Sequence, residues 1–162
     1  MIAIGCDHGG YELKTTVKDY LSQQGITWRD VGCDSADSAA DYPDYAKAVT
    51  DAILRGECEK GVLLCGTGIG VSIAANRVRG IRAALCHDVF SARQSRWHND
   101  ANVLAMGGRV IGTGAALEVL KAFLETEFSN DERHVRRLGK LKNMSNGELS
   151  VDFKEENQHG KL

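Results

Sequence analysis

Residues 61–72 read GVLLCGTGIGVS and predict a buried strand that turns abruptly into a helix. The apolar run Val62-Leu63-Leu64 is typical of a strand that is covered on both faces. The alternating glycines that follow let the backbone turn sharply and approach a ligand closely. The next helix begins with N–H groups that have no partner within the helix and with the positive end of its dipole. This turn is therefore suited to bind an anion or to stabilise an oxyanion.

Short apolar segments alternate with helical periodicities along the rest of the chain. Strands are predicted at Ile2–Cys6, Ile26–Val31, Gly61–Cys65, Ile81–Cys86 and Val103–Met106. Helices are predicted at Tyr11–Gln24, Tyr45–Leu54, Val71–Val78, Val89–Trp97, Gly114–Phe128 and Asp131–Lys142, with a loop over Gly32–Pro43. This alternation predicts an α/β fold with a five-stranded parallel sheet and helices on both faces. Ligands of such sheets bind at the carboxyl ends of the strands.

Length and composition narrow the class of protein. The 162 residues fit one domain, which we expect to span 1–143, with 144–162 as a polar C-terminal tail. With 43% hydrophobic and 26% charged residues, the chain has the composition of a globular protein. A formal charge of -2 argues against nucleic acid as a partner, and no apolar run approaches the length of a membrane span. Five cysteines and no visible signal peptide predict reduced thiols in the cytoplasm.

Cys65 is the cysteine best placed for chemistry, because it stands between the strand and the glycine turn. A helix N-terminus stabilises a thiolate, which can act as a base or a nucleophile. The alternative is a structural cysteine that ends a buried strand beside a simple turn.

Other polar residues follow predicted strands or share a helix face. Asp7 and His8 follow the first strand, where they could bind substrate or only cap the next helix. His98 lies in a predicted loop and could act as an acid or a base. Arg133 and Arg137 share one face of the last helix, a spacing that suits a phosphate monoester but also a solvated basic surface. Arg109 is a third candidate for the same anion.

Cofactor and metal signatures are weak. The dinucleotide fingerprint G-x-G-x-x-G fails because Val71 stands where its third glycine would be. No Gly-Lys-Ser/Thr follows the glycine turn, so it is not a Walker A loop. Neither Cys6-x-His8 nor Cys86-His87 belongs to a four-ligand zinc set. We therefore expect neither cofactor nor metal.

Several longer motifs, taken together and in order, resemble one family over roughly residues 1–142. They are GCDHGG at 5–10, DYPDY at 41–45, CGTGIG at 65–70, SIAANR at 72–77, GIRA at 80–83, SR at 95–96, HNDANVL at 98–104 and GRVIG at 108–112. These motifs resemble those of the type B ribose-5-phosphate isomerases, whose superfamily includes the galactose-6-phosphate isomerase subunits.

The resemblance implies a Rossmann-like three-layer α/β/α fold and a homodimer or dimer of dimers with active sites shared between subunits. It also implies a metal-free interconversion of an aldose phosphate and a ketose phosphate through a cis-enediolate. Cys65 matches the family's general base, and Val71 occupies the position where some relatives carry a glutamate instead. Thr67 and the amides of Gly66, Gly68 and Gly70 match the anion hole.

The remaining matches concern the sugar and its phosphate. His98 matches the residue that opens the furanose ring. The residues matching the hydroxyl-binding positions are Asp7, Tyr42 and Asn99, and those matching the phosphate-binding positions are His8, Arg109, Arg133 and Arg137.

The leading hypothesis is thus an isomerase of ribose 5-phosphate and ribulose 5-phosphate, as in the pentose phosphate pathway. The same chemistry on allose 6-phosphate, galactose 6-phosphate or an unphosphorylated rare sugar is the first alternative. A non-catalytic module that binds a sugar phosphate is the second, and a dinucleotide-dependent oxidoreductase is the weakest.

Overall fold

The computed structural model describes residues 1–37 and 39–145. Its strands are β1 (Ile2–Cys6), β2 (Trp28–Asp30), β3 (Lys60–Cys65), β4 (Ala83–Leu85) and β5 (Val103–Gly107). Its helices are a short 3₁₀ turn η1 (His8–Gly10), α1 (Tyr11–Gln23), α2 (Tyr42–Leu54), α3 (Ile69–Asn76), α4 (Val89–Asn99), α5 (Thr113–Glu125) and α6 (Glu132–Ser145). Met1–Ser129 form one compact unit, and a second unit begins at Asn130 and contains α6.

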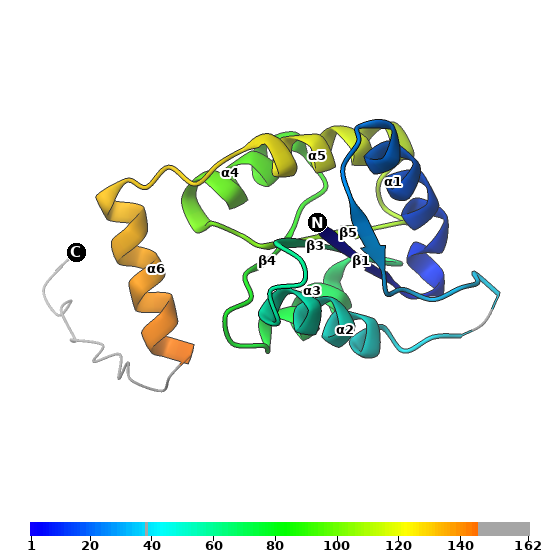
Figure 1. The fold of residues 1–162 in the computed structure, drawn as a ribbon, viewed down its shortest axis with the longest axis horizontal. Coiled ribbons are helices and arrows are strands. Elements are labelled where there is room, and N and C mark those ends of the chain that lie inside the picture. Colours follow the sequence, from blue (N-terminus) through cyan, green and yellow to red (C-terminus); the bar gives the residue numbers. More distant parts are fainter. Residues whose placement is uncertain (38, 146–162) are drawn as a thin grey trace, which may run out of the picture. The chain divides into compact units, whose positions relative to one another are not determined.

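The five strands form a single parallel sheet, as the alternating pattern predicts (Figure 1). Their order in the sheet is β2-β1-β3-β5-β4. The chain moves from β1 outward to β2 and then returns to place β3 on the other side of β1. In open α/β sheets such a reversal leaves a crevice at the carboxyl ends of the two strands. The residues that follow β1 and β3 therefore meet at one site.

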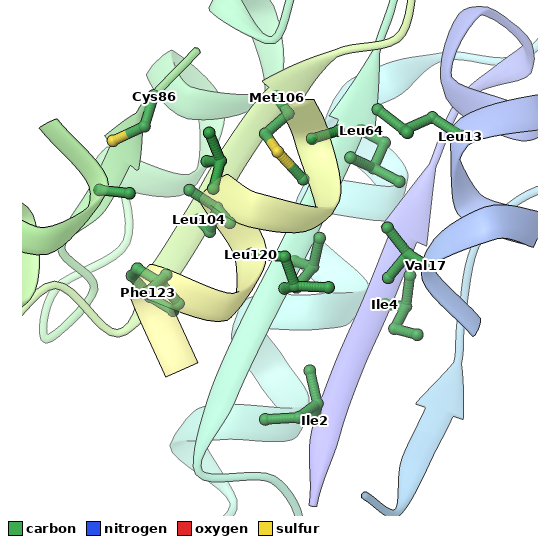
Figure 2. Packing of buried hydrophobic residues seen from close by; sticks show 14 of the residues in the cluster. Ile2, Ile4, Leu13, Val17, Leu64, Cys86, Leu104, Met106, Leu120 and Phe123 are labelled. Atoms are coloured by element: carbon green, nitrogen blue, oxygen red, sulfur yellow. The ribbon is translucent and has the colours of Figure 1, made fainter. Parts of the chain in front are cut away.

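The two faces of the sheet are covered by different helices, with α1, α4 and α5 over one face and α2 and α3 over the other (Figure 1). Successive side chains of a strand point to opposite faces. Ile4, Leu64 and Leu104 therefore point toward the first face. Residues of α1 and α5 cover them there, namely Leu13, Val17, Leu120 and Phe123 (Figure 2). Smaller residues of the same strands, such as Ala3 and Ala105, pack on the second face. The result is the expected three-layer α/β/α fold.

Two helices begin two or three residues earlier than their periodicity predicts. Helix α2 begins at Tyr42 rather than Tyr45, because Pro43 lies in its first turn, where the fixed φ of proline suits a helix. Helix α3 begins at Ile69 rather than Val71, because Gly68 with a φ of +76° completes the turn. Both corrections bring residues of the predicted site, Tyr42 and Gly70, into first helical turns.

Helix α4 ends at Asn99, so the loop predicted around His98 is wrong. Asp100 ends the helix in the left-handed conformation, and its carboxylate binds Arg82 and Arg96, each at 2.8 Å. The Arg82 Nε also donates to the carbonyl of Asn99 at 3.0 Å. These bonds satisfy carbonyl groups that a helix C-terminus leaves without partners, and so they fix where α4 stops.

Helix α6 continues to Ser145, three residues beyond its predicted end at Lys142. Residues 146–162, most of the predicted tail, lie outside the described residues. Within the part of the chain that the structure describes, no helix is long and apolar enough to cross a membrane.

Candidate active site

A pocket of about 250 Å³ opens at the carboxyl ends of β1 and β3. It is lined by Asp7, His8, Gly9, Tyr42, Cys65, Gly66, Thr67, Gly70 and Arg109. All but Gly9 were predicted as site residues. Gly9 lies so close to the turn after β3 that a Cβ on it would be 2.8 Å from the Gly66 nitrogen. The sequence feature that could have identified Gly9 as a site residue is its place in the motif GCDHGG.

Cys65 ends β3 with only 5% of its surface exposed, and it faces the pocket. Its Sγ accepts a hydrogen bond from the Gly68 N–H at 3.0 Å. The left-handed conformation of Gly68 folds the chain back, so that this N–H points at the sulfur. An N–H donor beside the N-terminus of α3 stabilises negative charge on the sulfur. A thiol placed in this way is the candidate group for acid–base or nucleophilic chemistry in the pocket.

The other cysteines that end strands have a different environment. Burial raises the pKa of Cys6 to about 12 and that of Cys86 to about 11. Both therefore remain protonated near neutral pH. All five cysteines are free thiols, and Cys65 alone among them lines the pocket.

Asp7 and His8 organise the side of the pocket formed by β1. The Asp7 carboxylate accepts the Gly10 N–H at 3.1 Å, which confirms the capping interpretation, and the same residue lines the pocket. The His8 Nδ1 accepts the Ala40 N–H at 3.4 Å and so joins the loop before α2 to the end of β1. Both side chains shape the pocket through backbone contacts as well as facing it.

Tyr42 and Gly70 are in close contact across the pocket. A Cβ on Gly70 would lie 2.9 Å from the Tyr42 Cζ, well inside normal contact. Gly70 therefore leaves the space in which the tyrosine ring lies over the start of α3. This steric role adds to the anion-hole role that the resemblance implies for the Gly70 amide.

Arg109 brings a positive charge to the pocket. Its backbone N–H donates to the carbonyl of Gly66 at 3.0 Å, and the Gly108 N–H donates to that of Cys65 at 2.8 Å. The Arg109 side chain then passes over Gly66, where a Cβ would lie 3.6 Å from its Cδ. A guanidinium held this way over a row of backbone amides suits a phosphate group.

Four predicted residues are not among those that line the pocket. His98 and Asn99 end α4 just before β5 begins, at the amino ends of the strands, where Val103 pairs with Gly61. Cys65 lies at the opposite, carboxyl end of β3. It is four residues beyond Gly61, which is about 13 Å at ~3.3 Å per residue. Arg133 and Arg137 belong to α6 in the second unit.

Gly68 does not line the pocket directly and acts through its bond to Cys65. In residues 1–37 and 39–145, no three His, Cys, Asp or Glu side chains converge as a metal site would require.

The comparison with known proteins agrees with this geometry. Residues 2–141 match the family described as Ribose/Galactose Isomerase. A relative from Pectobacterium atrosepticum, D-erythrulose-4-phosphate isomerase, is 49% identical over 127 residues, which cover 78% of this chain and 84% of the relative.

Two solved structures show the same fold. Ribose-5-phosphate isomerase B of Clostridium thermocellum is 46% identical, with a TM-score of 0.88 over 90% of this chain and 97% of its own. The ribose 5-phosphate isomerase of Thermotoga maritima is 51% identical, with a TM-score of 0.85 over 88% of this chain and 97% of its own.

The fold and the comparisons thus define an α/β isomerase, with its candidate site at the carboxyl ends of β1 and β3. The chain belongs to the Ribose/Galactose Isomerase family.

Proposed function

We propose that this chain interconverts an aldose phosphate and a ketose phosphate, with ribose 5-phosphate and ribulose 5-phosphate as the preferred pair. The observation that carries the proposal is the Cys65 thiol, which faces the pocket and accepts the Gly68 N–H at 3.0 Å. The two solved structures named ribose 5-phosphate isomerases support the choice of substrate.

Cys65 acts as the general base in this proposal. Isomerisation moves one proton between C1 and C2 of the open-chain sugar, so one group must remove it and return it on the same face. As the proton leaves, negative charge builds up on the carbonyl oxygen and produces an enediolate. The backbone amides between Gly66 and Gly70, together with Thr67, lie beside the thiol and can stabilise that charge.

Positioning comes from both ends of the substrate. Arg109 is the charged group of this unit's pocket best suited to the phosphate, and His8 also lines this pocket. Asp7 and Tyr42 can bind hydroxyl groups of the sugar. Holding the sugar at both ends keeps C1 and C2 next to the Cys65 sulfur. Binding energy is thereby used to accelerate the proton transfer.

A second copy of the chain supplies the residues that this unit lacks. His98 and Asn99 lie at the amino ends of the strands, away from the pocket of their own subunit. In the proposal they enter the pocket of a neighbouring subunit, and Arg133 and Arg137 join the phosphate site there. Exposed apolar side chains in β4 and in the segments that follow β3, β4 and β5 support a homodimer: Ile69, Ile73, Leu85, Phe90 and Val110, with Phe90 70% exposed. The five free thiols fit the cytoplasm as its location.

A four-carbon substrate is the second candidate. The relative named D-erythrulose-4-phosphate isomerase shares 49% of its aligned residues with this chain. A tetrose 4-phosphate cannot close a furanose ring, because its C4 oxygen carries the phosphate. It would therefore need the base and the anion hole but not the ring-opening function proposed for His98.

The test is a panel of sugars assayed in deuterated water. The panel contains ribose 5-phosphate, erythrose 4-phosphate, allose 6-phosphate, galactose 6-phosphate and unphosphorylated ribose. We expect the highest kcat/KM for ribose 5-phosphate, with deuterium appearing at C2 of the aldose or C1 of the ketose. Binding without exchange would favour the non-catalytic module, and equal rates with and without phosphate would remove the role given to Arg109.

A further inference from the structure

His87 follows Cys86, two residues beyond the end of β4, and it does not line the pocket. Its Nε2 accepts a hydrogen bond from the Gly107 N–H at 2.9 Å. The last backbone bond between these strands is the one from the Cys86 N–H to the carbonyl of Ala105, at 3.1 Å. Where β4 leaves the sheet, the imidazole thus takes the place of a strand carbonyl and holds the last residue of β5.

Gly107 in turn lies directly beneath the anion-binding turn. A Cβ on Gly107 would meet the carbonyl carbon of Thr67 at 2.6 Å and its oxygen at 2.7 Å. A Cβ on Gly68 would likewise lie 3.0 Å from the Gly107 nitrogen. The backbone of Gly107 therefore supports the peptide that joins Thr67 to Gly68, and this peptide carries the N–H bonded to the Cys65 sulfur.

We propose that His87 is a positioning residue for the isomerase reaction, one that acts through Gly107 on the amides around Cys65. The inference rests on the proposed function, in which these amides stabilise the thiolate and the enediolate. It assigns to His87 the neutral tautomer with its proton on Nδ1, since Nε2 is the acceptor. Without the acceptor, Gly107 is free to shift, and the Gly68 N–H loses its alignment with the sulfur.

Two amide substitutions separate this role from a general structural one. In His87→Gln the terminal oxygen reaches about as far as Nε2 and can still accept the Gly107 N–H. In His87→Asn the oxygen is one carbon shorter and cannot. The matched control is Asp88→Ala, which removes the carboxylate that caps α4 through the Ser91 N–H at 2.7 Å but leaves the bond to Gly107 in place.

Activity on the preferred sugar phosphate is the first measurement. We expect His87→Asn to lower kcat about tenfold with KM changed less than threefold, because substrate contacts remain while the amides around the thiol are displaced. His87→Gln should stay within threefold of the wild type in both parameters. Asp88→Ala should lower the melting temperature and leave kcat unchanged.

Two further measurements do not depend on isomerase activity. The Gly107 amide proton resonance should move upfield in His87→Asn and stay in place in His87→Gln. Alkylation of Cys65 by iodoacetamide, followed by mass spectrometry of its peptide, should slow at least threefold in His87→Asn only. If the wild type turned over no sugar in the panel, the proposed function would fail, and these two measurements would still decide whether His87 positions the turn.

Three results would overturn the inference. Unchanged kcat and alkylation in both amide variants would show that Gly107 holds its place without the imidazole. An equal loss in His87→Asn and His87→Gln would show that the acceptor at Nε2 is not what matters. A loss of kcat in Asp88→Ala as large as that in His87→Asn would mean that any loosening between β4 and α4 has the same effect.

Discussion

Replacing Cys65 with alanine removes the proposed base and leaves the rest of the pocket in place. Loss of a general base typically costs a factor of about 10²–10⁴ in rate, which corresponds to roughly 3–5.5 kcal/mol of activation free energy. We expect a loss at the upper end of that range in kcat, because no second thiol lines the pocket. KM should change little, since Arg109 and Tyr42 still hold the substrate.

The stability of the same variant should change far less than its activity. Cys65 is 5% exposed, and its sulfur accepts one N–H, from Gly68. Truncation leaves a small cavity at the edge of the pocket, where water can take over the Gly68 N–H. We expect a loss of about 1–2 kcal/mol in the free energy of unfolding, smaller than for a large residue deep in the core.

The assay follows ketose formation from ribose 5-phosphate, with circular dichroism and thermal melting to verify the fold. The matched control is Cys58→Ala, which also removes a buried thiol, but from the loop between α2 and β3, away from the pocket. Cys58→Ala should keep the kcat of the wild type. If folded Cys65→Ala kept more than a tenth of wild-type turnover, Cys65 would not be the base.

Three further predictions test the phosphate anchor, the fit of the pocket and the fold. Arg109→Met should raise KM for the sugar phosphate about 10–100-fold and weaken competitive inhibition by inorganic phosphate, and an unchanged inhibition constant would contradict its role. Gly70→Val should lower kcat/KM at least tenfold, because its side chain would collide with the Tyr42 ring; turnover like that of the wild type would show that the ring moves freely. Asp30 binds Lys14, which is 3% exposed, at 3.1 Å. Burial raises the pKa of the Asp30 carboxyl, but bonds from Lys18, the Gly32 N–H and Lys14 outweigh it and hold this pKa below its ordinary value. This contribution to stability is present above the unfolded-state pKa of about 3.9 and disappears as pH falls through the lower folded-state value. In urea titrations, Asp30→Asn should therefore be less stable than the wild type by about 2–4 kcal/mol at pH 7, and the difference should shrink below about pH 4. A difference independent of pH would exclude the ionised pair as its cause.

Local patterns predicted much of this molecule because their causes are local. The run Val62-Leu63-Leu64 is apolar over a strand's length, and the glycines after Cys65 let the backbone turn sharply. Residues that follow strands in a parallel sheet meet at one edge whatever the order of the strands. Because β1, β3 and β5 are also neighbours in the sheet, Asp7, Cys65 and Arg109 line one pocket.

Periodicity located the ends of helices less well, because caps decide them. Tyr42 and Ile69 begin their helices earlier than the apolar spacing indicates, through Pro43 and the left-handed Gly68. Helix α4 runs on through His98, since Asp100 and its two arginines end it. Such ends depend on single side chains and turns, which the spacing of apolar residues does not reveal.

The sequence by itself determined the class of fold, the strand-end thiol and the turn that surrounds it, since periodicity and glycine conformation act over a few residues. Only the tertiary structure decided the strand order, the fit of Tyr42 against Gly70 and the bond from Gly107 to His87. It also showed that His98 and Cys65 lie near opposite ends of the strands of one sheet. These relations join segments 20 or more residues apart, and their geometry follows from how helices and strands pack together, which no local pattern records.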